Sequence, residues 1–242
     1  MQIQTLTLDM PLHPRDISGF RAAIVELVGR EQEAFHNHDN TQGKPHYHWN
    51  YPLIQYKVQA GKATIVSMGE GQSLINQYLL ANIPDTLHFA GKTHEIHGFK
   101  VQKQHYNWSL HASLQPYGIL HWLGLNAENY KAWKTATRED VKQVILDKAL
   151  TGHLRAFARA LELPFESQIE GEVLKIHRTK AMNWHGQTFI GFNALIGSNL
   201  SLPQGMGLGR CTAFGFGEIQ LLEVYQHNIG RKKRRRPRLQ EV

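Results

Sequence analysis

Residues 52–68 read PLIQYKVQAGKATIVSM and hold the clearest structural signal in the sequence. Residues 52–59 and 62–68 are two apolar, β-prone runs, and Ala60 and Gly61 between them suit a tight turn. Both runs are too short for typical helices, and turn-forming residues bound each of them. We therefore expect a β-hairpin at this place in the chain.

The segments around this hairpin alternate between strand and helix patterns. Upstream, residues 2–9 (QIQTLTLD) alternate polar and apolar side chains, and residues 16–29 place apolar side chains at helical spacing. Downstream, we expect a helix over residues 72–81 and a strand over residues 93–110 (THEIHGFKVQKQHYNWSL). The resulting order is strand, helix, strand, strand, helix, strand, which is the order of the ferredoxin-like fold.

The second half of the chain repeats much of this pattern. Asn126 is a good N-cap for a short helix, and a longer helix follows it. The sequence thus predicts an α+β protein of two tandem ferredoxin-like (RRM-like) domains, residues 1–115 and 116–228, with a basic tail at 229–242. The elements expected in the second half are a strand from residue 116, the longer helix over 138–161, strands over 168–180 and 186–197, and a last strand over 218–225.

Composition restricts the functional classes. The chain has 242 residues, 27 Lys and Arg against 20 Asp and Glu, and a net charge of +7. Residues 231–242 (RKKRRRPRLQEV) hold seven of the basic residues and one acidic residue, so the body of the protein is close to neutral. Cys211 is the single cysteine, which excludes an intramolecular disulfide and a cysteine-based zinc site. With no signal peptide pattern and no long apolar run, a cytoplasmic protein without a membrane span is expected.

Four histidines gather in the polar stretch at residues 31–50. His36 and His38 form one His-x-His pair, and His46 and His48 form a second. Such pairs bind zinc, copper and iron, and the two together could supply four nitrogens to one ion. However, Asp39 follows the first pair directly, so the metallo-hydrolase pattern H-x-H-x-D-H is not matched. A purely structural role for these histidines also stays open.

Acid–base chemistry on RNA is the other functional reading of the histidines. In this reaction a 2′-hydroxyl attacks its own 3′ phosphate, while one group removes a proton and another protonates the departing 5′ oxygen. Histidine suits both tasks near neutral pH because its ordinary pKa is about 6.5. No metal ion is then required, since a cation such as Lys44 could stabilise the negative charge of the phosphorane.

A glycine-rich segment, LPQGMGLGRCTAFGFGEI at residues 202–219, precedes the expected last strand. Its glycines are too dense for the interior of a strand or helix, and they allow close backbone approach or convergence of N–H groups on an anion. The segment is neither a dinucleotide fingerprint nor a P-loop, because it leads into a strand and lacks Gly-Lys-Ser/Thr. A phosphate-binding loop and a simple cluster of turns remain the two readings.

Taken together, these motifs resemble a known family. FHNHD at 35–39, YPLIQYKV at 51–58 with GEG at 69–71, GILHWLGLNAENY at 118–130 and GLGRCTAFGFGEI at 207–219 look like the CRISPR repeat-RNA processing endoribonucleases. These are the Cas-six enzymes of the RAMP superfamily. The resemblance covers roughly residues 1–224, and the glycine-rich pattern before the last strand is its most specific part.

The resemblance implies a reaction and a set of site residues. It implies that CRISPR precursor RNA is cleaved within its repeats into mature guide RNAs, without metal ion or cofactor, leaving 2′,3′-cyclic phosphate and 5′-hydroxyl ends. It implies His36 and His38 as the catalytic residues. The implied RNA-binding residues are Arg178, Lys180, Arg210 and the loop glycines Gly205, Gly207, Gly209, Gly215 and Gly217.

Two alternatives and one unassigned segment remain. The chain could be a catalytically inactive RNA-binding subunit of a CRISPR effector complex, with other subunits as partners, or a His-rich metalloenzyme. The basic tail is not part of the family pattern, and it could be a nonspecific phosphate-binding arm or simply a solvated tail.

Overall fold

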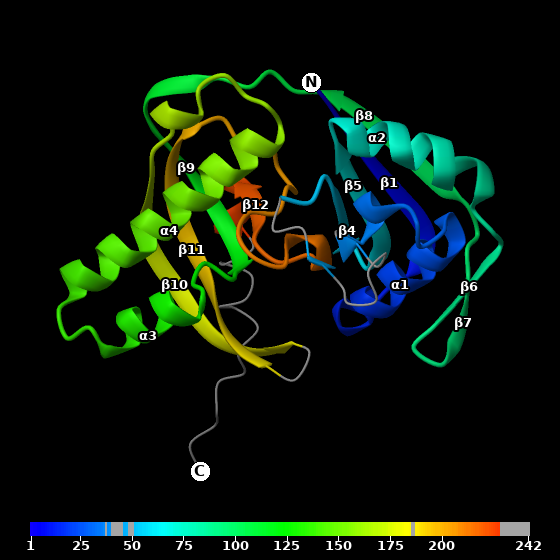
Figure 1. Ribbon diagram of the computed structural model, residues 1–242, viewed down its shortest axis with the longest axis horizontal. Helices are drawn as coiled ribbons and strands as arrows, with labels where there is room; N and C mark the ends of the chain where they lie inside the picture. Colours follow the sequence, from blue (N-terminus) through cyan, green and yellow to red (C-terminus); the bar gives the residue numbers. More distant parts are fainter. Residues whose placement is uncertain (37, 40–45, 48–50, 185–186, 228–242) are drawn as a thin grey trace, which may run out of the picture.

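The computed structural model describes residues 1–36, 38–39, 46–47, 51–184 and 187–227, with only the backbone described at 38–39, 46–47, 183–184 and 187. It shows two α+β domains side by side, each built on a four-stranded antiparallel sheet (Figure 1). Both sheets have the strand order of a ferredoxin-like domain, which confirms the predicted fold class.

The first domain follows the predicted element order. Its sheet has the order β4-β5-β1-β8, and every neighbouring pair is antiparallel. The second helix begins two residues earlier than expected and continues through a π-helical turn (Ile75–Leu79) and a 3-10 turn (Leu80–Asn82). The main elements are β1 (Gln2–Pro11), α1 (Ile17–Val28), β4 (Ile54–Gln59), β5 (Lys62–Met68), α2 (Glu70–Leu74) and β8 (Phe99–His105).

The stretch at 93–110 was wrongly predicted as one strand. It begins inside a hairpin of β6 (Thr86–Phe89) and β7 (Lys92–Glu95), and it ends at the start of the second sheet. Ala90 and Gly91 form the hairpin turn with φ of 51° and 71°, and Gly98 at φ 142° separates the hairpin from β8. The prediction missed this turn because Ala90–Gly91 lies before the stretch in which alternation was sought.

The second domain has the same topology with different connections. Its sheet order, β10-β11-β9-β12, repeats the first when strands are counted from the start of each domain. The predicted boundary at residue 115 falls inside β9, and the chain passes between the sheets at residues 106–109. The elements are β9 (Leu110–Trp122), α3 (Ala127–Thr135), α4 (Glu139–Ala160), β10 (Gly171–Trp184), β11 (Gln187–Leu200) and β12 (Glu218–Leu221).

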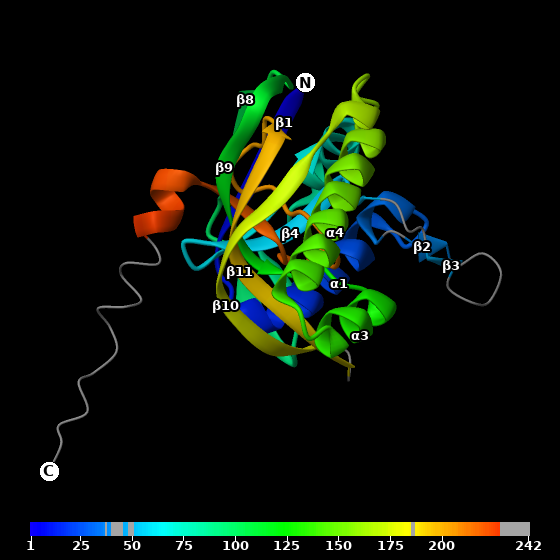
Figure 2. The same ribbon diagram turned by 90° about the vertical axis from the view of Figure 1, so that its left-hand side faces the viewer.

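The end of the last strand also differs from the prediction. β12 stops at Leu221, and residues 222–227 are helical instead of completing a strand to residue 225. The helical segment 222–227 lies on the sheet face opposite α4 (Figure 2). Its Tyr225 is buried over Gly118, where an added Cβ would lie 2.1 Å from the tyrosine ring. The prediction of a strand over 222–225 was therefore wrong, because Tyr225 packs on a face of the sheet and its segment does not extend β12.

The first sheet lies between two hydrophobic cores. Leu6 and Tyr56 face α1 in the first core, whose buried residues all come from the first domain, with Phe214 of the second domain packed against it. On the opposite sheet face, Val66 and Met68 pack into the second core together with Phe157 of α4. The central part of the first sheet, β5 with its neighbours β1 and β4, is thus covered on both faces, and the second domain provides the cover on one of them. The edge strand β8 is mostly exposed.

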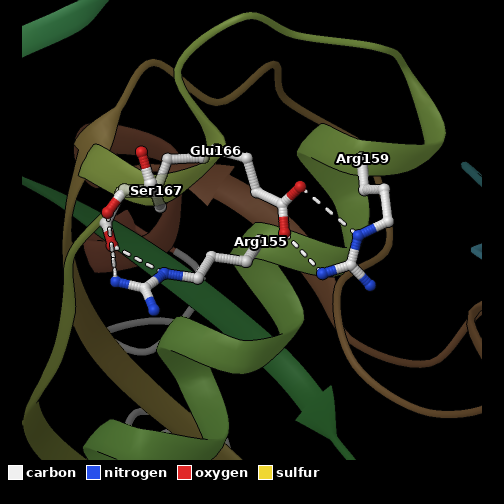
Figure 3. Close-up of polar contacts among 5 residues, drawn as sticks. Arg155, Arg159, Glu166 and Ser167 are labelled. Carbon is white, nitrogen blue, oxygen red and sulfur yellow. Dashed lines mark hydrogen bonds and ion pairs between the residues drawn. The ribbon is translucent and has the colours of Figure 1, made fainter.

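Helix α4 is held against the start of β10 by side chains on one of its faces. Arg155 donates to the backbone oxygens of Ser167 and Ile169, and Arg159 forms an ion pair with Glu166 (Figure 3). Further along α4, Asp147 accepts a hydrogen bond from the Val173 amide at 2.7 Å. These contacts attach α4 to the edge strand of the second sheet.

Candidate functional site

The first histidine of the predicted catalytic pair lies in a tight turn after α1. The turn contains a short 3-10 helix, Glu33–Phe35, and the His36 amide donates to the Glu33 oxygen at 3.0 Å. The His36 side chain is only 4% exposed, and its Nε2 lies 2.7 Å from the backbone oxygen of Arg30. The imidazole is therefore directed into the protein and fixed by a backbone contact.

Two further side chains hold the same turn. Tyr56 of β4 donates its hydroxyl hydrogen to the Phe35 oxygen at 3.2 Å, and Arg21 of α1 donates to the His36 oxygen. Burial lowers the pKa of Arg21 and raises that of Tyr56, so the Tyr56 hydroxyl keeps the hydrogen that it donates. The backbone that leads into His38 is thus clamped by α1 and by the central part of the first sheet.

The glycine-rich loop of the second domain touches this clamp. The Arg21 guanidinium lies over the Phe214 ring, 4.5 Å from its centroid. At Gly215 (φ 81°), an added Cβ would lie 3.3 Å from both the backbone oxygen of Tyr56 and the Ile17 side chain. The structure therefore brings the predicted histidine segment and the predicted glycine-rich loop together at the domain interface.

The glycine-rich loop is joined to the first domain through Gly207. The Gly207 amide donates to Gln55 Oε1 at 2.9 Å, and the Gly207 backbone oxygen accepts from the Tyr51 hydroxyl at 2.5 Å. Gln55 Nε2 in turn donates to the Tyr51 hydroxyl oxygen at 2.7 Å. A Cβ on Gly217 (φ 68°) would lie 1.9 Å from the Leu208 oxygen, so only glycine fits there. This contact with the loop was not predicted from the sequence, although Gln55 is a polar residue within the expected strand at 52–59.

The loop amides are largely used within the protein. The N–H groups of Gly205 and Gly217 donate to the backbone oxygens of Ile219 and His121, and that of Gly215 donates to the oxygen of Thr212. These amides, like that of Gly207, do not point at a ligand. An RNA-binding role of the five glycines therefore remains a prediction, and it would rest on the shape of the loop. Gly209 (φ 103°) packs against the Trp122 ring.

Of the other predicted site residues, Arg210 lies next to a pocket and Arg178 and Lys180 lie on an exposed strand. Arg210 donates to the Leu125 oxygen at 3.2 Å. His38 pairs with Tyr47 through a two-residue ladder of β2 (His38–Asp39) and β3 (His46–Tyr47), an ordered feature inside a stretch predicted as loop. The side chains of His38 and His46, together with Lys44, His48 and the basic tail, lie outside the described residues.

The β10–β11 hairpin leaves a long edge strand open to solvent. Every residue at 174–181 of β10 is exposed, on both faces of the ribbon. Arg178 and Lys180 lie in this exposed part and pair with Asn193 and Gly191 of β11. The two basic residues are therefore accessible to a ligand, but they are not part of the clamp around His36.

A polar groove of about 760 Å³ lies between the first sheet, at β1, β8 and the end of β4, and the second domain, at β12 and residues 202–205. It was not predicted, although the alternation of glutamines in FKVQKQHY could have indicated it. Lys103 lines a smaller adjoining cavity of about 220 Å³. Side-chain amides donate and accept hydrogen bonds, so this groove offers contacts to other polar molecules. The glutamines that line it are Gln59, Gln102, Gln104, Gln204 and Gln220.

Two kinds of feature are not found in the described part of the chain. Within residues 1–36, 51–184 and 187–227, no three His, Cys, Asp or Glu side chains are placed to hold a metal ion. No helix among the described residues is both long and apolar enough to cross a membrane. Of the four histidines in the proposed metal site, only His36 has a described side chain, so the structure does not test that alternative.

Comparisons with known proteins agree with the double-domain architecture. Family models of the Cas6b N-terminal and C-terminal domains match residues 1–107 and 109–222. An uncharacterised protein of Methanocaldococcus jannaschii is 29% identical over 102 residues, which cover 42% of this chain and 68% of that protein. The chain thus has a Cas6-type fold and belongs to the Cas6b family, which confirms the family indicated by the sequence motifs.

Solved structures show the same fold over nearly the whole chain. A crystal structure of Cas6b matches with a TM-score of 0.79 at 21% identity, covering 92% of this chain and 100% of that one. A crystal structure described as CRISPR RNA processing endoribonuclease Cas6b matches with a TM-score of 0.65 at 18% identity, covering 91% and 99%. A type IV Cas6 crRNA endonuclease, Csf5, matches with a TM-score of 0.51 at 13% identity, covering 91% and 98%.

Proposed function

We propose that this Cas6b-family endoribonuclease cleaves CRISPR precursor RNA within its repeats by metal-independent acid–base catalysis, leaving 2′,3′-cyclic phosphate and 5′-hydroxyl ends. Membership of the Cas6b family supports the substrate class. The observation that carries the chemistry is the clamp on the turn before His38, made by Tyr56, Arg21 and the Arg30 oxygen at the interface with the glycine-rich loop. Catalytic groups gain most of their effect when they are held in place before the substrate arrives.

The burial of His36 favours unequal roles for the two predicted catalytic histidines. A group that exchanges protons with RNA must come within hydrogen-bond reach of the reacting oxygens. His36 is 4% exposed, and its Nε2 lies 2.7 Å from the Arg30 oxygen, so in this arrangement it acts as a positioning residue. His38 follows two residues later, on a backbone that has left the turn for a strand, and it is the proposed catalytic residue. Lys44 remains the proposed stabiliser of the phosphorane charge.

The second domain would hold the RNA. Arg178 and Lys180 lie on the exposed part of β10, where they can contact phosphates without a change in the fold. The glycine-rich loop with Arg210 would form the adjacent part of the RNA surface. The proposed partners are the repeat RNA, as precursor and as mature guide RNA, and other subunits of a CRISPR effector complex.

Cleavage of a labelled repeat RNA in excess EDTA, followed by analysis of the end groups, tests this proposal. The wild-type protein is expected to give a cyclic phosphate and a 5′-hydroxyl, and His38→Ala is expected to lose about 10²- to 10⁴-fold in rate. Loss of activity in EDTA would instead support the His-rich metalloenzyme. RNA binding without cleavage by the wild-type protein would support the inactive subunit of an effector complex.

The role of His36 can be separated from that of His38 by the pH profile of cleavage. His36→Gln can still donate a hydrogen bond to the Arg30 oxygen, whereas His36→Ala cannot. A positioning residue predicts that the glutamine variant is faster than the alanine variant and keeps both limbs of the wild-type profile. If His36→Gln loses one limb of the profile, His36 itself exchanges protons with the RNA.

A further inference from the structure

A small pocket in the second domain lies apart from the histidine segment. Its volume is about 230 Å³, below the ~300–1,000 Å³ typical of sites for drug-sized ligands, so it suits a single ring system. All its lining residues come from the second domain: the first residues of α3 and the turn before it, the start of β11, and the glycine-rich loop. Tyr130 and Phe189 provide aromatic walls, and Arg210 provides the cation.

Arg210 is fixed at the edge of this pocket from two directions. Its backbone amide donates to the Leu123 oxygen at 3.2 Å, and its guanidinium Nη1 donates to the Leu125 oxygen, also at 3.2 Å. The guanidinium lies over the Phe189 ring, 5.5 Å from the centroid. An arginine held in this way keeps its planar face and its other N–H groups available at little entropic cost.

The charge and position of the pocket favour a nucleotide over a neutral apolar ligand. A second cation, Lys134, lies over the Tyr130 ring at 6.0 Å, so positive groups border both aromatic walls. Phe189 pairs with Met182 at the far end of the same ribbon that exposes Arg178 and Lys180. RNA that follows the basic ribbon would therefore reach the pocket.

We propose that this pocket receives one unpaired nucleobase of the repeat RNA, stacked on Phe189 and Tyr130 and contacted by Arg210. The proposal rests on the proposed function, since it assumes that repeat RNA is the ligand. Proteins recognise single-stranded RNA in this way, by placing extruded bases on aromatic rings and on arginine planes. The pocket would select a nucleotide outside any paired region, and the ribbon would contact phosphates without regard to sequence.

An abasic scan of the repeat RNA tests the pocket. Each nucleotide is replaced in turn by an abasic residue, and the dissociation constant is measured for the wild-type protein and for Phe189→Ala. One unpaired position is expected to lose about 10- to 100-fold in affinity for the wild type, and its loss is expected to shrink to about threefold or less in Phe189→Ala. All other positions should respond alike in both proteins.

Two matched variants complete the test. Phe99→Ala removes an aromatic ring that is 51% exposed on β8, away from the pocket, and should leave the abasic profile as in the wild type. Phe189→Leu keeps most of the apolar volume and should show the same loss of coupling as Phe189→Ala, which separates stacking from packing.

The proposal is overturned if no position couples to Phe189 or if Phe99→Ala changes the profile equally. It is also overturned if neutralising one phosphate couples to Phe189 while removing bases does not, because the pocket would then hold a phosphate. In each of these outcomes the wild-type protein still binds and cleaves the repeat, so the proposed function survives. Absence of repeat binding by the wild type removes both proposals.

Discussion

The two domains share one strand order and differ in what connects their third and fourth strands. In the first domain this connection is a helix that runs from Glu70 through Asn82, followed by the β6–β7 hairpin. In the second domain it is the glycine-rich loop, with only a short 3-10 turn at Thr212–Phe214. A helix satisfies its own backbone groups, but a loop needs other partners. At Gly207 the first domain supplies them through Tyr51 and Gln55.

The strands of the two sheets also differ in their exposure to solvent. Every residue of β5 from Ala63 to Met68 is buried, because one face of the first sheet packs on α1 and the other on the second domain. In β10, residues 174–181 are all exposed. The first domain is thus the enclosed part that fixes the histidine turn, and the second domain carries the surface open to a large ligand.

Distorting the glycine-rich loop that links the domains should have the largest effect. Gly217→Ala places a Cβ 1.9 Å from the Leu208 oxygen at a φ of 68°, so the loop must move, and a loss of about 3–5 kcal/mol in unfolding free energy is expected. Gly61→Ala is the matched control, because its φ is 79° and nothing lies within 4 Å of the added Cβ. That control should cost only about 1–2 kcal/mol. Urea denaturation of both variants checks this, and equal losses would contradict the role of the loop.

Removing a buried charge on the first sheet should stabilise the protein. Lys57 is 1% exposed, its Nζ has no hydrogen-bond partner within the described residues, and burial lowers its pKa to about 8. Lys57→Met should therefore add up to about 3 kcal/mol in unfolding free energy below pH 8. Between pH 8 and about 10.5 the folded wild type loses its proton before the unfolded chain does, so the wild type recovers stability and the gain shrinks.

Lys62→Met on the neighbouring strand is the control for this comparison. Lys62 is about half exposed and pairs with Asp9 at 2.7 Å, so its replacement should change stability by less than about 1 kcal/mol. Denaturant melts of both variants at pH 7 and pH 10 give the result. A destabilised Lys57→Met protein would show that the ammonium has a partner that stabilises the fold.

Acid should destabilise the second domain through His153, a partly buried residue of α4 that packs edge-on against Trp122. Burial, and then the Arg210 charge, lower the pKa of this histidine to about 4. The unfolded chain takes up a proton near pH 6.5, before the folded protein does, so up to about 3 kcal/mol is lost as the pH falls from 6.5 to 4. His153→Gln should flatten this part of the stability profile, whereas His111→Gln, at an exposed site on β9, should not. Identical profiles for wild type and His153→Gln would contradict the assignment.

The smallest effects are expected on the exposed ribbon. Arg178→Ala and Lys180→Ala should each weaken RNA binding by roughly three- to tenfold. Each should also reduce the slope of log affinity against log salt concentration by about one. Stability should not change, because neither residue is buried. Titrations at several salt concentrations measure both quantities. An unchanged salt dependence would show that these residues do not contact phosphates.

Much of this organisation could be predicted from the sequence because it depends on local patterns. The period-2 alternation before Asp9 and the helical spacing in α1 and α4 are found as expected. Asn126 caps α3 by accepting from the Asn129 amide at 2.7 Å, as its residue type indicated. These signals need no knowledge of distant parts of the chain.

The features that were missed depend on contacts between distant segments. The burial of His36 depends on Arg30 and on Tyr56 from another strand, and no spacing in the sequence reveals it. The partner of the glycine-rich loop, Gln55, lies 152 residues from Gly207. Tyr225 fits a strand pattern in the sequence, but in the structure its ring packs over Gly118 on the face of the sheet. Long-range packing therefore decided where the sequence analysis failed.

The most direct test of the division between the domains is a single-turnover experiment on repeat RNA, which measures the dissociation constant and the cleavage rate at saturating protein separately. The account predicts that His38→Ala loses about 10²- to 10⁴-fold in rate while its dissociation constant stays within about threefold of the wild type. It predicts the reverse for the Arg178→Ala/Lys180→Ala variant, with weaker binding and a nearly unchanged rate at saturation. A His38→Ala protein that cleaves at the wild-type rate, or a ribbon variant that binds normally and cleaves slowly, would contradict it.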